Sequence, residues 1–515
     1  MKKTFVAGAL FMALALGCTD LSESPQSAIS PGNFYRNEAE VLAGLAGVYA
    51  QLRSTLDDYY NVSEISTDEM IVPTRGQDWY DGGTWLDLHA QTWTPTSPAA
   101  GAFLGGAWNA AFAGVSRANV LLDALKNVSV PNQGTIESET RVLRGFYYYL
   151  LMDLFGRLPI STTGEIQALA NQSRDSVFKF IEAELLAARP GLPVTWNAAN
   201  NGRITRGVVD AMLANMYINA GVFTKDGAAG GISATAYNAC TGITVSGGLT
   251  ACQAALNRAD SVLLSSAGYQ LADTFAKNFR GDNANSKENI FVVKFIPQDG
   301  LGLNFVMRAL HYNQYNPSPW NGFATIAQTY DAFDSTDRRR GIFLIGPQRN
   351  VETGVLVNDR AGNPLVFTKT INDITQATEG EGARIYKFPS DPGHVAQNNG
   401  NDYPWFRLSE MYLVKAEAEL NGATGTSTPL ALVRAVRARA FATDTLSAIT
   451  LPGILRQRLF EFTGEGKRRQ DLIRFGGYSS GTWSFKTARP DHYVLMPIPQ
   501  GQIDANPNLT QNPGY

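Results

Sequence analysis

The sequence contains little charge and few of the residues that build metal or redox centres. Only 17% of its 515 residues are charged, against roughly 25% in an average globular protein, and it has four histidines and three cysteines. We therefore expect no elaborate zinc or iron–sulfur site and no cofactor. The 43 basic and 46 acidic residues leave a net charge of −3, too balanced for a protein that binds nucleic acid through its charge. No stretch reaches eighteen consecutive apolar residues, so no helix is expected to cross a membrane.

Apolar and small polar residues are abundant instead. A hydrophobic fraction of 44% is enough for a large core and excludes wholesale disorder. With 49 glycines and 20 tyrosines, the surface must owe its polarity to Asn, Thr, Ser and Tyr, which favours a secreted or envelope protein. Length alone suggests about three domains of ~150 residues, although one large helical domain is also compatible with it.

The start of the chain has the pattern of a bacterial export signal. A short basic start precedes an apolar run over residues 4–16, which is too short to span a bilayer. Cys18 follows almost at once and resembles the acylated cysteine of a lipoprotein lipobox, although that motif prefers Leu where Ala15 stands. We predict a lipoprotein signal peptide over residues 1–17 and lipidation of Cys18. The alternative is an ordinary signal peptide followed by an incidental cysteine.

The segment after Cys18 predicts a tether rather than folded structure. Residues 18–33 are rich in Ser, Pro and Gln and show no apolar period. Two or more acyl chains on the cysteine would anchor such a tether stably in a membrane, since each buried CH₂ contributes ~0.8 kcal/mol.

The two remaining cysteines, Cys240 and Cys252, flank a stretch rich in Gly and Thr. Outside the cytoplasm such a pair can oxidise, and closing a loop of this size would stabilise the fold by ~3 kcal/mol in the chain-entropy model. We predict a disulfide between them. The alternative is two unrelated small core residues.

Apolar residues recur at helical spacing in eight segments, which form four consecutive pairs. The pairs are expected at about residues 38–127, 138–189, 205–268 and 405–441, with stop signals such as Gly156, Gly221 and Gly422 at helix ends. They resemble tetratricopeptide repeats, although no fixed period of 34 residues survives. Because stacked helix pairs cannot bury their apolar faces singly, we expect one continuous core rather than three domains.

Two long segments between the helices lack helical periodicity. Residues 68–105 and 297–323 combine Trp and Tyr with Gly, Asp, Asn and Pro. Loops of this length inside a compact protein are usually functional. Short β-like runs at residues 290–296 and 493–498 predict a few small strands.

Several motifs, most of them in the C-terminal third, are specific enough to indicate a family. They are WFRLSEMYLVKAEAELN at 405–421, EFTGEGKRRQDLIR at 461–474, LMPIP at 495–499 and NPNLTQNPGY at 506–515. Shorter upstream segments agree in order: NFY at 33–35, STDE at 66–69, RAN at 117–119, RGFYY at 144–148, GRLP at 156–159 and DRR at 337–339. Together they resemble the SusD/RagB family, over nearly the whole chain after the signal peptide.

The resemblance implies a mainly α fold: a single SusD-like domain over residues 34–515, with a C-terminal motif region at about 455–515. Four tetratricopeptide-like helix pairs would support a loop-rich half that carries the ligand site and a few short strands. It further implies a lipid-anchored protein of the outer membrane that faces the cell exterior and is not an enzyme. Such proteins capture oligosaccharides, or in some members peptides, and deliver them to a TonB-dependent outer-membrane transporter similar to SusC. Which ligand this chain binds does not follow from the resemblance.

A site for sugars needs aromatic platforms beside amide and carboxylate groups on exposed loops, and both long loops supply that mixture. Members of the family also tend to place binding aromatics in these two regions. The predicted ligand-binding residues are Asp78, Trp79, Tyr80, Asp81, Trp85, Tyr312, Tyr315, Asn316, Trp320 and Asn321. The alternative is that these rings fix the loops to the helical scaffold.

Other functions receive less support from the sequence. Alternating charges over residues 461–474 would suit an anionic ligand but more often form ion pairs, so we expect a structural role. The motif GYSSG at 477–481 matches the nucleophile elbow of serine hydrolases, yet the α/β alternation of that fold is missing and a turn explains the motif better. A scaffold that binds only a protein partner remains a third possibility.

A metal site is also considered and not expected. Asp331, Asp334 and Asp337 have the spacing to share one helix face and hold Ca²⁺. Asp337 is better placed to pair with the arginines that follow it, so we predict no essential metal.

Overall fold

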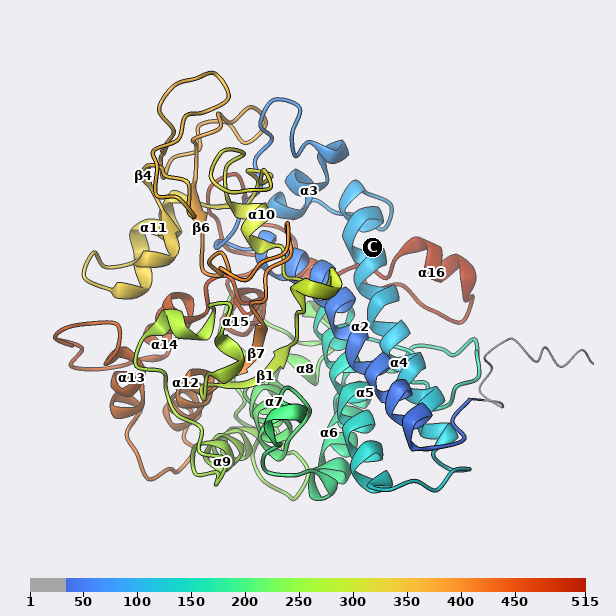
Figure 1. Ribbon diagram of the computed structural model, residues 1–515. Coiled ribbons are helices and arrows are strands. Elements are labelled where there is room, and N and C mark those ends of the chain that lie inside the picture. Colours follow the sequence, from blue (N-terminus) through green and yellow to red (C-terminus); the bar gives the residue numbers. More distant parts are fainter. Residues whose placement is uncertain (1–33) are drawn as a thin grey trace, which may run out of the picture.

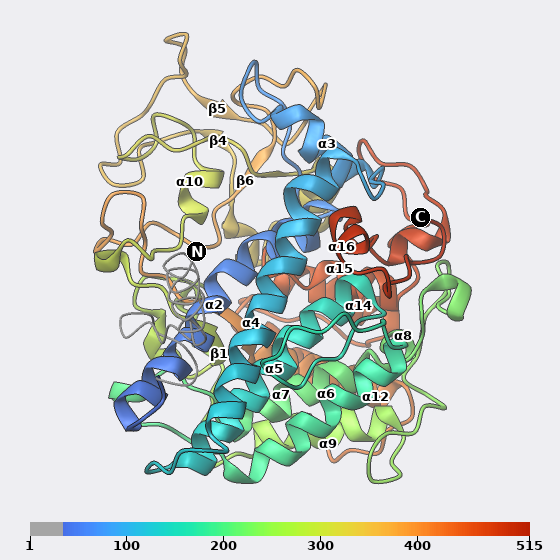
Figure 2. The same ribbon diagram turned by 90° about the vertical axis from the view of Figure 1, so that its right-hand side faces the viewer.

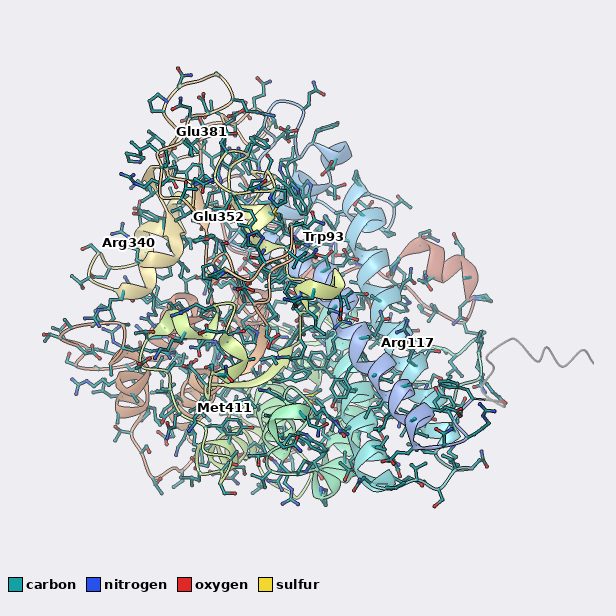
Figure 3. All side chains as sticks on the ribbon, viewed as in Figure 1. Trp93, Arg117, Arg340, Glu352, Glu381 and Met411 are labelled. Atoms are coloured by element: carbon teal, nitrogen blue, oxygen red, sulfur yellow. A yellow bond between two sulfur atoms is a disulfide. The ribbon has the colours of Figure 1, made fainter. Side chains whose placement is uncertain are left out.

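The computed structural model describes residues 34–515. The predicted signal peptide over 1–17, the lipidated Cys18 and the tether over 18–33 lie outside the described residues. Figure 1 shows two regions, a stack of helices in the lower and right-hand part and a loop-rich part above it. In Figure 3, Met411 lies in the first region, and Glu352 and Glu381 lie in the second.

Eight helices make up the stack, and each packs against the next one along the chain (Figures 1 and 2). They are α2 (Glu38–Ile65), α4 (Gly105–Ala124), α5 (Gln133–Phe155), α6 (Arg174–Ala188), α7 (Arg206–Ile218), α9 (Ala251–Leu263), α12 (Leu408–Leu420) and α13 (Pro429–Arg437). Taken two at a time they are the four predicted pairs, which confirms the mainly helical fold class. The largest hydrophobic cluster extends from Val41 to Leu509, as expected for a continuous core.

The other α-helices of residues 34–515 lie outside the stack order, and all but α14, with 12 residues, are shorter than every stack helix. They are α3 (Thr84–Ala90), α8 (Ala220–Phe223), α10 (Phe305–Ala309), α11 (Ala327–Ala332), α14 (Leu451–Phe462), α15 (Arg468–Arg474) and α16 (Gln500–Ala505). Two of them, α3 and α10, fall in the segments expected to be free of helix. That expectation was wrong because helices of seven and five residues are too short to show a period.

The sequence explains where the first stack helices begin and how closely they pack. The side chain of Asn37 accepts a hydrogen bond from the backbone N–H of Glu40, which caps the start of α2. On α4, Gly114 faces the ring of Tyr147 on α5, and a Cβ at this position would lie 2.5 Å from that ring. The two helices therefore approach closely only because residue 114 is glycine.

Within residues 34–515, seven short strands form three small sheets. They are β1 (Asn289–Val293), β2 (Ala324–Thr325), β3 (Phe343–Leu344), β4 (Gly346–Pro347), β5 (Val366–Phe367), β6 (Ala383–Ile385) and β7 (Tyr403–Arg407). All pairings are antiparallel, with the orders β1-β7, β2-β6-β3 and β4-β5. The run predicted at residues 290–296 is largely β1. The run at 493–498 is not a strand, because the Met496 N–H donates to the carbonyl of Leu154 at the end of α5 instead of to a neighbouring strand.

The residues after Val494 close the end of the first helices. Asn512 donates from its side chain to the carbonyls of Phe155 and Met496, each at 2.8 Å. Tyr515 donates to the carbonyl of Leu495 at 2.8 Å and accepts a hydrogen bond from the indole of Trp93 at 2.9 Å. The NPNLTQNPGY motif is thus a structural closure of α5 rather than part of an open site.

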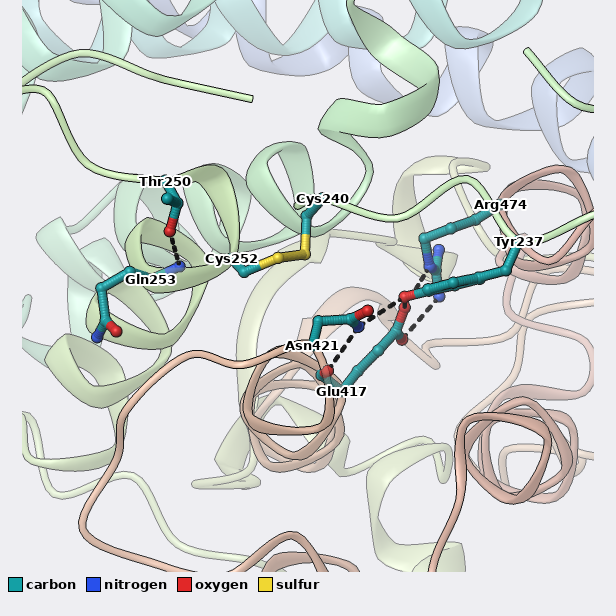
Figure 4. The surroundings of a disulfide bond; sticks show 8 residues. All are labelled: Tyr237, Cys240, Thr250, Cys252, Gln253, Glu417, Asn421 and Arg474. Atoms are coloured by element: carbon teal, nitrogen blue, oxygen red, sulfur yellow. Dashed lines mark hydrogen bonds and ion pairs between the residues drawn. A yellow bond between two sulfur atoms is a disulfide. The ribbon is translucent and has the colours of Figure 1, made fainter. Parts of the chain in front are cut away.

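A disulfide joins Cys240, in the long connection after α8, to Cys252 in the first turn of α9 (Figure 4). Close to it, the Tyr237 hydroxyl donates to Glu417 on α12 at 2.9 Å and accepts from the Asn421 amide at 2.9 Å. The guanidinium of Arg474 donates to the same Glu417 carboxylate at 2.7 Å. The connection between α8 and α9 is therefore attached to the stack at both α9 and α12.

Candidate functional site

The two aromatic loops, far apart in the sequence, lie against each other at the top of the molecule in Figure 1, where α3 and α10 mark them. The indole N–H of Trp79 donates to the backbone carbonyl of Trp320 at 2.5 Å. The hydroxyl of Tyr312 donates to the carboxylate of Asp78, also at 2.5 Å. Both segments proposed from the sequence therefore belong to one surface region, which we call the two-loop site.

Three of the predicted ligand-binding residues do not fit this site because their side chains are buried. Trp85, Tyr315 and Asn321 are 8%, 4% and 0% exposed. A stacking platform needs a free face and an amide contact needs a free polar atom. The assignment of these three residues to the ligand was wrong.

Each of the three is buried by a specific set of contacts. The indole of Trp85 donates to Asp81 at 2.7 Å and packs 4.7 Å from the ring of Phe103. Tyr315 belongs to a small hydrophobic cluster with Val306, Met307 and Leu310. Trp85 and Tyr315 therefore fix the loops to the scaffold. This is the alternative role that the sequence left open for these rings.

Asn321 is held by a buried arginine. Its side-chain oxygen accepts from Arg384 at 2.8 Å, its amide donates to the Glu379 carbonyl at 3.2 Å, and its own carbonyl accepts from Arg75 at 2.9 Å. These polar atoms of Asn321 therefore serve the loop and leave none for a ligand.

Trp79 is also mainly structural. Its ring lies against Gly322, where a Cβ would come within 2.4 Å of the indole, and it packs edge-on to Trp85 and Phe323. Its main-chain φ of 63° falls in the left-handed region, which a tryptophan rarely adopts. The surrounding contacts therefore hold Trp79 in place and leave it only partly exposed.

Of the other six predicted residues, Asp78 is partly exposed but its carboxylate is bound by Tyr312 and Arg360, and five remain accessible. Tyr80 is 57% exposed, Asp81 and Asn316 are exposed, and Trp320 and Tyr312 are partly exposed. This group combines three rings with a carboxylate and an amide on neighbouring loops. Such a surface can stack on the apolar face of a sugar ring and hydrogen-bond to the hydroxyls at its edge.

The sequence did not reveal a third segment, residues 358–381, that completes the site. Its Arg360 lies over the ring of Tyr312, with the guanidinium carbon 4.1 Å from the ring centroid. Arg360 also contacts Asp78 at 3.1 Å and Glu379 at 2.5 Å. The Arg360 side chain therefore covers one face of a predicted platform, and nothing in the local pattern of residues 358–381 marks it for this position.

Glu379 organises this corner of the site. Partial burial alone would raise the pKa of Glu379, but hydrogen bonds from the Arg360 backbone, His311 and the Arg360 side chain lower it to about 2. Burial lowers the pKa of His311 despite its 2.9 Å contact with Glu379. The guanidinium of Arg360 is thus already paired with both Asp78 and Glu379, which leaves it unavailable to an anionic ligand.

The charged segment at 461–474 is structural, as expected. We call the buried charged residues around it the ion-pair core: Glu288, Arg339, Lys387, Arg407, Arg439, Glu461 and Glu465. Burial alone would raise the pKa of Glu461, but Arg439, Arg407 and Arg339 hold it far below its usual range. Each charge in the core faces at least one opposite charge, so none is available to a ligand.

The nucleophile-elbow motif also forms a structural turn. Helix α15 precedes it where a hydrolase needs a strand. Ser479 is fully buried, and the Lys486 amine donates to the carbonyls of Tyr478, Ser479 and Gly481 at 2.6–2.8 Å. The motif therefore binds a lysine of the same chain instead of presenting a serine.

The three aspartates considered for Ca²⁺ do not share a helix face. Helix α11 ends at Ala332, Asp331 pairs with Lys369 at 2.7 Å, and Asp337 pairs with Arg339 at 2.7 Å. The Asp337 pairing matches the expectation. Across residues 34–515, no group of three or more potential metal ligands lies together, and the same residues contain no helix both long and apolar enough to cross a membrane.

Comparison with known proteins finds similar sequences over most of the chain. The family model described as "SusD family" matches residues 324–515, and the one described as "Starch-binding associating with outer membrane" matches residues 33–218. The starch-binding protein SusD of Bacteroides thetaiotaomicron is 24% identical over 512 residues, covering 88% of this chain and 85% of the relative.

Solved structures share the fold. A laminarin-binding SusD-like protein superposes with a TM-score of 0.70 at 23% identity, covering 93% of this chain and 100% of the other. Surface glycan-binding protein A from Bacteroides thetaiotaomicron, in complex with laminarihexaose, gives a TM-score of 0.72 at 19% identity, covering 92% and 99%. The solved structures show the fold, and because the two family models together match residues 33–218 and 324–515, the chain belongs to the SusD/RagB family.

Proposed function

We propose that this protein is a cell-surface lipoprotein that binds oligosaccharides at the two-loop site and delivers them to a TonB-dependent outer-membrane transporter. The observation that carries the proposal is the meeting of two aromatic loops through the Trp79–Trp320 and Tyr312–Asp78 hydrogen bonds. The glycan-binding names of the relatives support the same ligand class. The ligand contacts are assigned to Tyr80, Asp81, Tyr312, Asn316 and Trp320.

A double substitution of two exposed rings, Tyr80→Ala with Trp320→Ala, tests this assignment. Each ring that stacks on a sugar contributes about 1 kcal/mol or more, so the double variant should bind at least tenfold more weakly. The fold should survive, because Tyr80 is exposed and Trp320 accepts the Trp79 bond through its main chain. Affinity gels containing starch or laminarin, followed by calorimetry, measure the effect.

The control for this experiment is Phe441→Ala, which removes a partly exposed ring just after α13 in the helical stack. It should bind glycan as the wild type does. Equal glycan binding by the double variant and the wild type would remove the two-loop site from consideration. Trp85, a natural first choice from the sequence, is unsuitable for this test because it is buried.

The wild type and the double variant also distinguish two other functions, a peptide receptor and a scaffold. A peptide-binding member of the family would bind peptides and not glycans, again with loss in the double variant. A pure scaffold would bind neither and would still co-purify with its transporter. We expect the double variant to co-purify with the transporter as the wild type does, since the substitutions leave the helical stack unchanged.

We propose no enzymatic activity. The release of reducing ends from a bound polysaccharide, abolished by a single Asp or Glu substitution, would contradict a binding-only function.

The proposed membrane attachment depends on Cys18. Cys18→Ser should move the protein from the membrane fraction to the soluble fraction, because the acyl chains provide the whole anchor. Fractionation with mass spectrometry of the mature N-terminus measures this, and a wild-type N-terminus without acyl chains would exclude lipidation. Ser27→Ala, a change in the tether, is the matched control and should remain in the membrane fraction.

A further inference from the structure

A long groove lies on the helical half of the molecule. Three hollows of about 620, 350 and 450 Å³ follow one another. The first two share Trp196 and Arg203 in their lining, and the last two share Asn285, Ser286 and Lys287. Neighbouring hollows therefore adjoin one another, and we call the three together the Trp196 groove.

The groove is remote from the two-loop site. Its walls are the segment between α6 and α7 and the segment between α9 and β1, with β1 residues such as Asn289 as its floor. In both Figure 1 and Figure 2, α7 and β1 lie in the lower half, whereas α3 and β4 lie at the top. A ligand in the groove would not reach Tyr80 or Trp320 within one short oligosaccharide.

The walls of the groove are held in place before any ligand arrives. Asn201 on one wall donates to the carbonyl of Ala284 on the other at 2.9 Å. The indole of Trp196 donates to the Ile204 carbonyl at 2.9 Å, and the guanidinium of Arg203 lies 4.1 Å from the ring centroid. Little side-chain ordering is therefore left to oppose binding.

The polar groups around the middle hollow include one hydrogen-bond acceptor that has no donor. The side-chain oxygen of Asn289 is buried and has no hydrogen-bond partner among the described residues, while its amide nitrogen donates to the carbonyl of Asn278 at 3.3 Å. A buried acceptor without a donor costs about 1–3 kcal/mol. Because this oxygen is closed off from solvent, the groups open to a ligand are the exposed amides of Asn197, Asn201 and Asn285, which stand around the same space.

The charges along the groove largely cancel. Lys277 pairs with Asp273 at 2.6 Å, and the Arg280–Asp282 contact is 3.5 Å. Arg203 is paired with Glu139, which is fully buried. Arg206 and Lys287 also line the groove without a carboxylate of residues 34–515 in salt-bridge distance, and Glu38 offsets them in part, so the lining keeps a small positive excess. A nearly neutral lining favours an uncharged ligand, and its mixture of one indole with many amides and hydroxyls fits a polyhydroxylated chain.

We propose that the Trp196 groove is a second carbohydrate site, which takes a neutral oligosaccharide several sugars long. The proposal extends the function proposed above. Two separate sites on one molecule would bind a polysaccharide with greater avidity than either site alone, because the second contact is made within an existing complex.

Fluorine NMR of protein labelled with 5-fluorotryptophan tests this site separately from the two-loop site. The chain has eight tryptophans, and Trp196→Phe and Trp320→Phe assign the two resonances of interest. In a titration with neutral gluco-, manno-, xylo- and galacto-oligosaccharides at millimolar concentrations, at least one should shift the Trp196 resonance saturably. Asn197→Ala and Asn285→Ala should each weaken that titration at least fivefold, whereas Asn127→Ala, an exposed amide elsewhere, should not.

Each result identifies which site fails. If the Trp320 resonance moves with a glycan and the Trp196 resonance moves with none, the second site is refuted and the two-loop site stands. Movement of Trp196 alone refutes the two-loop site, and movement of neither refutes both. A Trp196 shift that acidic oligogalacturonates produce as strongly as neutral sugars would overturn the neutral ligand class.

Discussion

Replacing Arg407 by leucine should lower the free energy of unfolding by about 3–5 kcal/mol or prevent folding altogether. Arg407 is 1% exposed and donates to Glu288 at 2.6 Å, Glu461 at 3.0 Å and Glu465 at 2.6 Å. Leucine would leave four buried carboxylates, these three and the Asp337 partner of Arg339, with three cations, Arg339, Lys387 and Arg439. The remaining partners, such as Arg439 on Glu461, cannot neutralise all of them.

Urea unfolding followed by circular dichroism measures the effect of Arg407→Leu. Arg407→Lys should be intermediate, because it keeps the charge but loses the geometry that serves several carboxylates at once. Lys179→Ala is the control: its pair with Asp175 is exposed, so the change should stay within about 0.5 kcal/mol. An Arg407→Leu protein within 1 kcal/mol of the wild type would show that the ion-pair core contributes little to stability.

Replacing Glu69 by glutamine should make the protein more stable at pH 8 and leave its stability at pH 4.5 unchanged. Glu64 and Glu69 are buried neighbours beneath the turn at 463–466, where the N–H of Gly464 donates to Glu69 at 3.2 Å and the N–H of Gly466 donates to Glu64. Burial raises the pKa of Glu64 to about 7. Burial and the neighbouring Glu64 carboxylate raise the pKa of Glu69 well above its usual range.

The sign of the pH effect follows from these raised values. An unfolded glutamate has a pKa of about 4.3, so between roughly pH 4.5 and 7 the folded protein binds more protons than the unfolded chain. Stability contributed by this pair is therefore present at low pH and is lost as the pH rises through that window. Glutamine mimics the protonated carboxyl group and should remove the loss, with a gain of about 1–3 kcal/mol at pH 8.

Unfolding curves at several pH values test the Glu69 prediction. Glu165→Gln, an exposed site, should leave the pH profile of the wild type unchanged. A Glu69→Gln protein with the same decline in stability between pH 5 and 7.5 as the wild type would show that the buried pair is not its source.

The helical half of the fold could be predicted from the sequence because the patterns that indicate each helix are local. The apolar stripe that includes Val41, Leu45 and Val48 is buried at the spacing of a helix. The pairing of helices followed because each such stripe needs a partner. The short helices α3 and α10 could not be read, since their formation depends on neighbours supplied by the rest of the chain.

The candidate site was only partly readable, for a different reason. Composition located both loops, but it could not tell which aromatic side chains face outward. The burial of Trp85 depends on Phe103, and Asn321 is held by Arg384, more than sixty residues further along. The positions of Arg360 and Glu379 could not be predicted at all. A charged pair in a polar segment has the same sequence pattern whether it covers an aromatic ring or faces water.

The closure of α5 by Asn512 has a consequence for how the protein is made. The hydrogen bond from Asn512 to the Phe155 carbonyl joins residues 357 positions apart. The ribosome releases helix α5 long before it releases the C-terminal segment that contains Asn512. During synthesis the first helix pairs therefore lack the contacts that this segment provides. Contacts of such long sequence separation form slowly, and a chain released before residue 494 would keep its repeats yet lack the closure that completes them.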